Sequence, residues 1–157
     1  MILKEVKIGQ IGDVITGNTP PKKDPNNYGG IYPFIKPTDM DIDRRYVTEW
    51  EENYSEKAFN KYYRAYIPPG ATGVVTIGTV GDKLFQAHQH CFTNQSVNVI
   101  IPNDNYYDDY VFYLMKLNLP KVENANPGTA SGRHHVSKSN FCSIKVDVVE
   151  CLNSQKR

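Results

Sequence analysis

The most informative part of this 157-residue sequence is its opening, where residues 6–20 read VKIGQIGDVITGNTP. Apolar side chains fall at Ile8, Ile11, Val14 and Ile15. This spacing suits either a short helix or an irregular strand, and the residues alone leave both open. The glycine, asparagine and prolines that close the stretch predict a turn at its end, followed by an exposed loop.

Beyond this opening, glycine and proline divide the chain into short segments rich in Thr, Tyr, Val and Ile, which favours strands and turns over long helices. Pro33 predicts that the strand around it lies at a sheet edge, because proline lacks the N–H that a central strand uses. Strands are expected at residues 31–35, 73–78, 97–101 and 143–148, with 84–85 pairing back as a hairpin.

Two short helices are also expected. Ser55 is suited to the N-cap of a helix that runs through Lys61. Residues 104–117 are the clearest helix, with an i, i+3, i+4, i+7 pattern at Tyr107, Tyr110, Val111 and Leu114. The predicted class is α+β: a β-rich, irregular sheet or barrel-like domain with one or two short helices.

Length and composition are those of one globular domain, since domains commonly hold ~100–200 residues. Hydrophobic residues make up 39% and charged residues 22% of the chain, which indicates a soluble protein rather than a disordered one. No apolar run approaches the ~18 residues of a membrane helix, and the first residues lack the features of a signal peptide. We therefore expect a cytoplasmic protein without a membrane partner.

Motifs for nucleotide binding and nucleophilic catalysis fail at their diagnostic positions. Gly73 and Gly78 have the spacing of a phosphate-binding loop, but Thr79 stands where a lysine is required. No G-x-G-x-x-G occurs, and no Ser-His-Asp or Cys-His arrangement is evident. We expect no cofactor and no catalytic residue.

Metal sites are also not expected. An aspartate alternation at residues 39–43 begins like a calcium loop, but Arg44 and Trp50 replace the glycine and glutamate that such a loop requires. Three cysteines without a CxxC pair favour neither a disulfide framework nor a four-cysteine zinc site. The remaining possible ligands, without a characteristic spacing, are His88, His90, Cys91, His134 and His135.

Five sequence elements occur in an order that resembles the target-recognition domain in the specificity subunit of type I restriction–modification systems, over about residues 6–147. The opening stretch looks like the start of such a domain, and Tyr32 is an extra residue relative to the family's pattern. The other elements are residues 28–39 (YGGIYPFIKPTD), 69–72 (PGAT), 93–96 (TNQS) and 132–141 (GRHHVSKSNF), with a helix at 109–116 before the last. Each element is weak alone, and their order makes the resemblance specific.

The resemblance implies a non-catalytic reader of double-stranded DNA. In that family, two such domains held apart by long helices each read half of a split site, and the helices bind methyltransferase subunits. This chain carries one such domain, assigned to residues 1–150, with 151–157 as the start of a truncated connecting segment. It could be an excised domain or a half-subunit. The implied partners are modification and restriction subunits and a second recognition domain or copy. An Asn-Pro-Pro-Tyr or Asp-Pro-Pro-Tyr methylation motif is absent, so another chain would methylate.

Charge distribution places the predicted DNA contacts on loops. The net charge is only +1, but residues 124–146 contain no acid, and phosphate binding requires local rather than global positive potential. Residues 126–139 are therefore the first choice. There, Arg133 could pair with guanine, worth ~1–3 kcal/mol of discrimination. Thr129, Ser131 and His134 could add polar contacts, and Lys138 a phosphate contact.

Further candidate contacts lie on other loops. The stretch 19–23 supplies Thr19, Lys22 and Lys23, and the stretch after the first predicted strand supplies Lys36 and Thr38. The amides after Thr93 are ambiguous, because they could read adenine or brace a turn. The set is completed by Thr76, Thr79, Asn94 and Gln95.

Other functions remain open at this point. The domain could come from a single-chain type II restriction–modification enzyme, which the full gene would distinguish. A peptide- or sugar-binding module could use Tyr62, Tyr63 and Tyr66 as a platform, although tyrosines at this density more often pack in a core. A small hydrolase would need a catalytic constellation that the sequence does not display. The base sequence that the domain reads does not follow from these residues.

Overall fold

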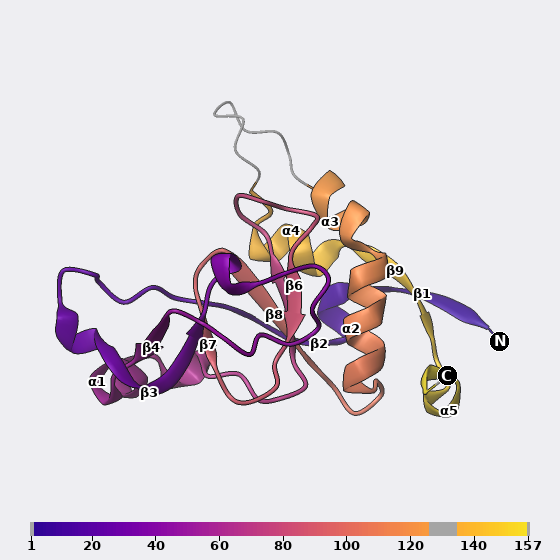
Figure 1. Cartoon of the computed structure of the whole chain (residues 1–157). Helices are drawn as coiled ribbons and strands as arrows, with labels where there is room; N and C mark the ends of the chain where they lie inside the picture. The colour runs from indigo at the N-terminus through magenta and orange to yellow at the C-terminus, as the bar shows by residue number, and fades with distance from the viewer. Residues whose placement is uncertain (1, 126–134, 157) are drawn as a thin grey trace.

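Three open sheets organise the chain in a computed structural model that describes residues 2–125 and 135–156. A two-stranded sheet pairs β1 (Leu3–Lys7) with β9 (Lys145–Val149). A four-stranded sheet has the order β2 (Gly12–Thr16), β8 (Val97–Pro102), β5 (Thr72–Val75), β6 (Leu84–Gln86). A three-stranded sheet has the order β4 (Glu52–Tyr54), β3 (Tyr28–Ile35), β7 (Phe92–Thr93). The four-stranded sheet lies between the other two (Figure 1).

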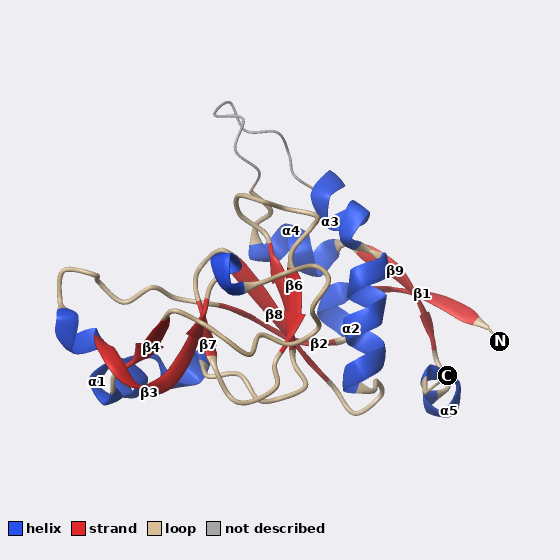
Figure 2. Cartoon of the chain, viewed as in Figure 1, coloured by secondary structure: helices blue, strands red, loops and turns tan. Residues whose placement is uncertain are grey.

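Short helices surround these sheets, as Figure 2 shows. They are α1 (Glu56–Tyr62), α2 (Asp108–Leu117), α3 (Leu119–Asn124), α4 (Lys138–Ser143) and α5 (Leu152–Gln155). Single 3-10 turns are η1 (Ile8–Gln10), η2 (Pro25–Asn27), η3 (Pro37–Asp39) and η4 (Tyr63–Ala65). The α+β class is confirmed, and the described residues hold three short helices, α3, α4 and α5, beyond the two that the sequence predicted.

The opening stretch is both a helical turn and a strand. It forms η1 and then β2, and Ile8 and Ile11 are fully buried. The Ile8 amide donates to the carbonyl of Ile144 (2.9 Å), and the Ile11 amide donates to the carbonyl of Ile8 (3.0 Å). The mixed spacing of the apolar residues thus reflects two elements in succession.

Several predicted elements are confirmed, and one prediction about strand position is wrong. The Ser55 side chain caps α1 by accepting from the Ala58 amide, and β6 pairs with β5 as a hairpin. However, β3 is the central strand of its sheet and not an edge strand. The reason is that β7 pairs with β3 only at Phe34 and Ile35, so Pro33 faces a ladder partner only in β4. The helix α2 also begins later than predicted, at Asp108.

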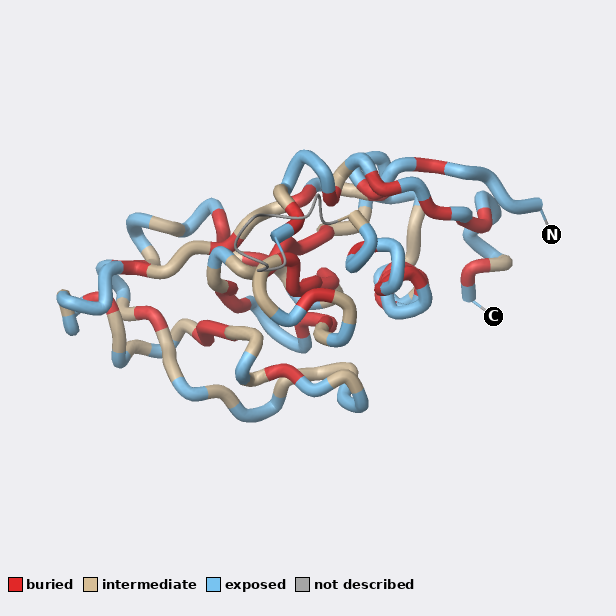
Figure 3. The backbone as a smooth tube through the Cα atoms, turned by 90° about the horizontal axis from the view of Figure 1, so that it is seen from above, coloured by how far each residue is buried: buried red, intermediate tan, exposed pale blue. Residues whose placement is uncertain are grey.

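The buried apolar residues of the described chain form three clusters that follow the sheets. The buried backbone runs through the centre of the molecule, while the ends of the chain are largely exposed (Figure 3). One cluster packs α2, α3 and α4 against β2, β8 and β9, and a second lies around β5, β6 and β8. The third is aromatic and holds the three-stranded sheet against α1 through Phe34, Tyr54 and Phe92. These clusters fix the positions of β2, α1 and α4, which line the candidate site.

Candidate nucleic-acid interface

A groove of about 370 Å³ lies between β2, the α1–η4 segment and the first residue of α4. The β2 wall supplies Val14, Ile15 and Thr16, and Asn18 follows it. Three cations line the same groove: Lys61, Arg64 and Lys138. We call this site the basic groove.

Local structure explains why these three cations point outward. Lys61 and Arg64 are exposed, whereas Ala58 of the same segment is fully buried in the aromatic cluster. Lys138 opens α4, which Ser137 caps by accepting from the Asn140 amide. The fully buried Phe141 fixes the other face of α4 in the core. The cations are thus presented by anchored helical turns.

All the charged residues that line the basic groove are positive. None of the described residues that line it is acidic, and within the described chain its three cations make no ion pair with a carboxylate. Two of them lie over neighbouring rings: Lys61 Nζ is 5.5 Å from the centroid of Tyr62, and the Arg64 guanidinium is 5.8 Å from that of Tyr63. These contacts leave the positive charges available to an external anion. Lysine and arginine side chains arranged in this way are suited to DNA phosphates.

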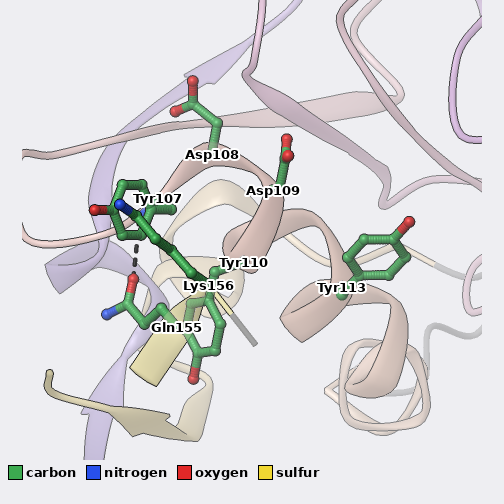
Figure 4. A pocket seen from close by; sticks show the side chains of 7 residues that line it. All are labelled: Tyr107, Asp108, Asp109, Tyr110, Tyr113, Gln155 and Lys156. Atoms are coloured by element: carbon green, nitrogen blue, oxygen red, sulfur yellow. Dashed lines mark hydrogen bonds between the residues drawn. The ribbon is translucent and has the colours of Figure 1, made fainter. Parts of the chain in front are cut away.

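Two other hollows are lined by more carboxylates than cations. One of about 420 Å³ is lined by Asp39, Asp41, Glu49 and Glu51, with Arg44 as its one basic residue among those described. Another, of about 670 Å³, lies at the start of α2 and is shown in Figure 4. Its lining residues are Tyr107, Asp108, Asp109, Tyr110, Tyr113, Gln155 and Lys156. Carboxylates in both hollows disfavour a phosphate, so we do not place DNA there.

Two of the predicted phosphate contacts are held in an internal ion network. Lys36 Nζ is 2.7 Å from Glu52 Oε1, and Lys22 pairs with the same oxygen. These hydrogen bonds, that of Lys22 first, lower the pKa of the Glu52 carboxyl below its ordinary value. Thr38 Oγ1 lies 3.4 Å from Glu51, which is also near Lys36. The network therefore competes with any phosphate for these lysines.

This competition predicts that Glu52→Gln strengthens binding to DNA duplexes. Each lysine released toward a phosphate would add about eightfold at 0.1 M salt and steepen the slope of log K against log salt by ~0.9. Fluorescence anisotropy over a salt series measures both. Glu123→Gln is the matched control, because Glu123 is an exposed carboxylate without an ion pair in the described chain. An unchanged slope in Glu52→Gln would mean that Lys22 and Lys36 face away from DNA.

The remaining predicted contacts on described loops fall into separate groups. Thr19 Oγ1 donates to Gln95 Oε1, which joins two candidates that are 76 residues apart. Asn94 Oδ1 accepts from the Ser96 amide at 3.0 Å, so this side chain braces the turn before β8. Lys23 and Thr79 are exposed on loops. Thr19 and Gln95 therefore stay in the candidate set. Asn94 braces a turn, which was the alternative to reading adenine.

Thr76 is not suited to contact DNA. Its side chain has no exposed surface, and its hydroxyl accepts from Asn98 Nδ2 at 2.8 Å. The sequence predicts a strand at this position but does not indicate which neighbours cover the side chain. We therefore remove Thr76 from the proposed contacts.

The sequence missed Lys61 and Arg64 as candidate contacts. They lie in the run KYYRAY at residues 61–66, which interleaves basic and aromatic residues as many nucleic-acid-binding segments do. Four candidates of the first-choice loop, Thr129, Ser131, Arg133 and His134, lie outside the described residues. Of that loop, the structure places Lys138 in the basic groove.

Three of the residues that suggested other chemistry, His88, His90 and Cys91, have contacts or burial that the structure describes. His88 and His90 lie against the rings of Tyr46 and Tyr66, and no group of three or more metal-ligating side chains suited to an ion occurs in the described ranges. Burial raises the pKa of the Cys91 thiol to about 12, so this thiol is protonated at neutral pH and is a poor nucleophile.

The proposed tyrosine platform is largely part of the core. Tyr62 and Tyr66 pack on the aromatic cluster, and only Tyr63 of the three is exposed. Separately, no helix in the described part of the chain has the length and apolar character to cross a membrane.

Comparison with known proteins gives a consistent result. The family model described as "Type I restriction modification DNA specificity domain" matches residues 3–157. The chain is 32% identical over 109 residues to the type I restriction enzyme HindI specificity subunit of Haemophilus influenzae, covering 69% of this chain and 23% of that protein. It is 32% identical over 111 residues to the MjaIX specificity subunit of Methanocaldococcus jannaschii, covering 70% and 26%. The chain thus spans about a quarter of these relatives.

Solved structures share the fold. The HsdS subunit from Thermoanaerobacter tengcongensis superimposes with a TM-score of 0.71 at 17% identity, covering 99% of this chain and 35% of that one. A chain from a structural study of the assembly and conformational transition of the type I R-M system gives a TM-score of 0.73 at 19% identity, covering 99% and 36%. The present chain corresponds to about a third of each.

Proposed function

Because this chain belongs to the family of type I restriction modification DNA specificity domains, we propose that it recognises a specific base sequence in double-stranded DNA. The observation that carries this proposal is the basic groove, in which three cations without acidic partners in the described chain are presented together. These cations would hold phosphates and set the register of the domain on DNA. Bases would be read by side chains of residues 126–139 and of the Thr19–Gln95 pair.

The proposed role is that of a recognition module without catalysis. It would direct modification and restriction subunits to a site in cytoplasmic DNA, while those subunits perform the chemistry. The 32% identity to two specificity subunits supports this role. We propose that residues 1–150 are the reading domain and that 151–157, including α5, begin the segment that connects it to the rest of such an assembly. A second recognition domain or copy would then supply the other half of the site.

Duplex binding is the first test of this proposal. A fluorescent duplex of mixed sequence is expected to bind with the ~10⁻⁴–10⁻⁶ M affinity of non-specific complexes at physiological salt, and more tightly as salt is lowered. A single-stranded competitor of equal length controls for simple polyanion binding. Absence of binding at 50 mM salt would contradict the proposal.

Arg133→Ala is expected to impair sequence discrimination more than affinity. If Arg133 pairs with guanine, the substitution costs ~1–3 kcal/mol on a selected sequence and little on random duplex. Lys23→Ala removes one charge from an exposed loop and is expected to weaken both complexes alike. Titration of each variant with selected and random duplexes distinguishes the two. If Arg133→Ala lost equal affinity for the selected and the random duplex, Arg133 would contact a phosphate and not a base.

A further inference from the structure

A chain of hydrogen bonds crosses the interior of the four-stranded sheet through Asn98 on β8. Thr16 Oγ1 donates to Asn98 Oδ1 at 2.6 Å, and Asn98 Nδ2 donates to Thr76 Oγ1 at 2.8 Å. The backbone continues the connection, because the Val136 amide donates to the Thr76 carbonyl at 2.7 Å. Asn98 is 2% exposed, and its side-chain oxygen and nitrogen are both bonded. Each link therefore depends on protein partners and not on solvent.

One end of this chain lies on the β2 wall of the basic groove, and the other lies just before α4, whose first residue lines the groove. Thr16 lines the groove from β2. Val136 stands two residues before Lys138, and the intervening Ser137 caps α4. Lys138 is the first residue of α4, so the bond at Val136 is one of the contacts that set where this helix begins, together with the Ser137 cap and the buried Phe141. Asn98 is thus the only side chain of the described residues bonded to both Thr16 and Thr76.

An asparagine is an unusual choice for this position. Its neighbours on β8, Val97, Val99 and Ile100, are aliphatic and fully buried, and asparagine has a low preference for strands. A buried amide also loses its hydration, which its hydrogen bonds only offset. An aliphatic side chain would serve the core equally well. The backbone ladders already pair β8 with β2 and β5. What the amide adds is a side-chain link from Thr16 to Thr76, the residue that follows β5.

We infer that Asn98 is a positioning residue that ties the β2 wall of the basic groove to the residue before the α4 cap and so helps to place Lys138 against a DNA phosphate. This inference rests on the proposed function for its consequence in DNA binding. It assigns Asn98 and Thr76 an indirect role, since both are buried and touch no DNA themselves.

The test compares Asn98→Leu with wild type in duplex binding over a salt series. Loss of one aligned phosphate contact is expected to reduce the slope of log K against log salt by ~0.9 and to weaken binding about eightfold at 0.1 M salt. In a Lys138→Ala background, Asn98→Leu is expected to cause no further loss, because the contact that it positions is already gone. A wild-type slope in Asn98→Leu, or fully additive losses, would overturn the inference.

Asn118→Leu is the matched control for a general effect of losing a buried amide. Asn118 is 9% exposed and donates to the Leu114 carbonyl at 2.8 Å, at the junction of α2 and α3. We expect it to lower the melting temperature without changing the salt slope. If Asn98→Leu does not fold, Thr76→Val removes the hydroxyl in the same chain with a smaller change in shape, and the same loss of slope is expected.

A measurement without DNA separates this inference from the proposed function. Hydrogen exchange of the Val136 amide reports directly on its bond to the Thr76 carbonyl. Faster exchange of this amide is expected in Asn98→Leu and not in Asn118→Leu. Unchanged protection would overturn the positioning role even if wild type binds DNA. Faster exchange in a protein that binds no duplex would refute the proposed function alone.

Discussion

Neutralising the basic groove, as Lys61→Ala, Arg64→Ala and Lys138→Ala together, is expected to abolish useful DNA binding near physiological salt. The three cations line one groove and have no carboxylate partner in the described chain. Each phosphate contact releases counterions worth about eightfold in affinity at 0.1 M salt, so three contacts amount to roughly 500-fold. The slope of log K against log salt is expected to fall by ~2.7. Anisotropy titrations from 50 to 200 mM salt measure both quantities.

A matched variant removes the same charge elsewhere. Lys4→Ala, Lys116→Ala and Lys145→Ala take three exposed cations from β1, α2 and β9, none of which lines the groove. This variant is expected to keep most of the affinity and nearly the wild-type slope. If the two triple variants lose equal affinity, the DNA would follow the overall charge of the chain and the groove would have no special role.

Tyr54→Ala is expected to remove a large part of the domain's free energy of unfolding. Tyr54 is fully buried, with its ring stacked 4.1 Å from that of Phe92 and tilted 4.8 Å from that of Phe34. Its hydroxyl donates to the Asn18 carbonyl at 2.8 Å. Truncating a buried aromatic costs ~3–5 kcal/mol, compared with the ~5–15 kcal/mol that stabilises a domain. Urea unfolding followed by circular dichroism measures the loss.

Tyr54→Phe separates the ring from its hydroxyl. It keeps the stacking on Phe92 and removes only the hydrogen bond to Asn18, which is worth ~1 kcal/mol. Because Asn18 lines the basic groove, we also expect a small loss of DNA affinity in this variant. A loss of less than ~1 kcal/mol for Tyr54→Ala would contradict the aromatic cluster as the core of this end of the molecule.

Local sequence signals predict the elements well where neighbouring residues decide them. The Ser55 cap and the strand at Val97 depend on residues a few positions apart, and the hairpin at Leu84 pairs residues only 10 to 14 positions apart. The position of β3 in its sheet depends instead on Phe92, which is 58 residues beyond Phe34. Sheet order of this kind has no local signal, so Pro33 wrongly indicates an edge.

The candidate site also combines features that the sequence predicts locally with features that depend on distant residues. Residue type and charge mark Lys138 as a candidate phosphate contact, and the structure places it on the groove. Lys61 and Arg64 join it only because the fold brings the α1–η4 segment beside β2. The ion pair between Lys22 and Glu52 joins residues 30 positions apart, and the sequence did not predict it either. Burial of Thr76 depends on Asn98 and Ser96, which belong to a neighbouring strand and the turn before it. The charge and polarity of each residue could thus be predicted from the sequence. Its ion-pair and hydrogen-bond partners, and the residues with which it shares the groove, could not.

Selection from a random duplex library tests the central claim, that this chain reads sequence, most directly. The protein is incubated with the library at moderate salt, and the retained duplexes are sequenced. We expect an enriched motif of a few base pairs, absent when the groove variant is used. Two copies fused through a helical spacer raise the effective concentration at paired sites and should recover the same motif twice. Retained sequences indistinguishable from the input for both the single chain and the fusion would contradict sequence recognition.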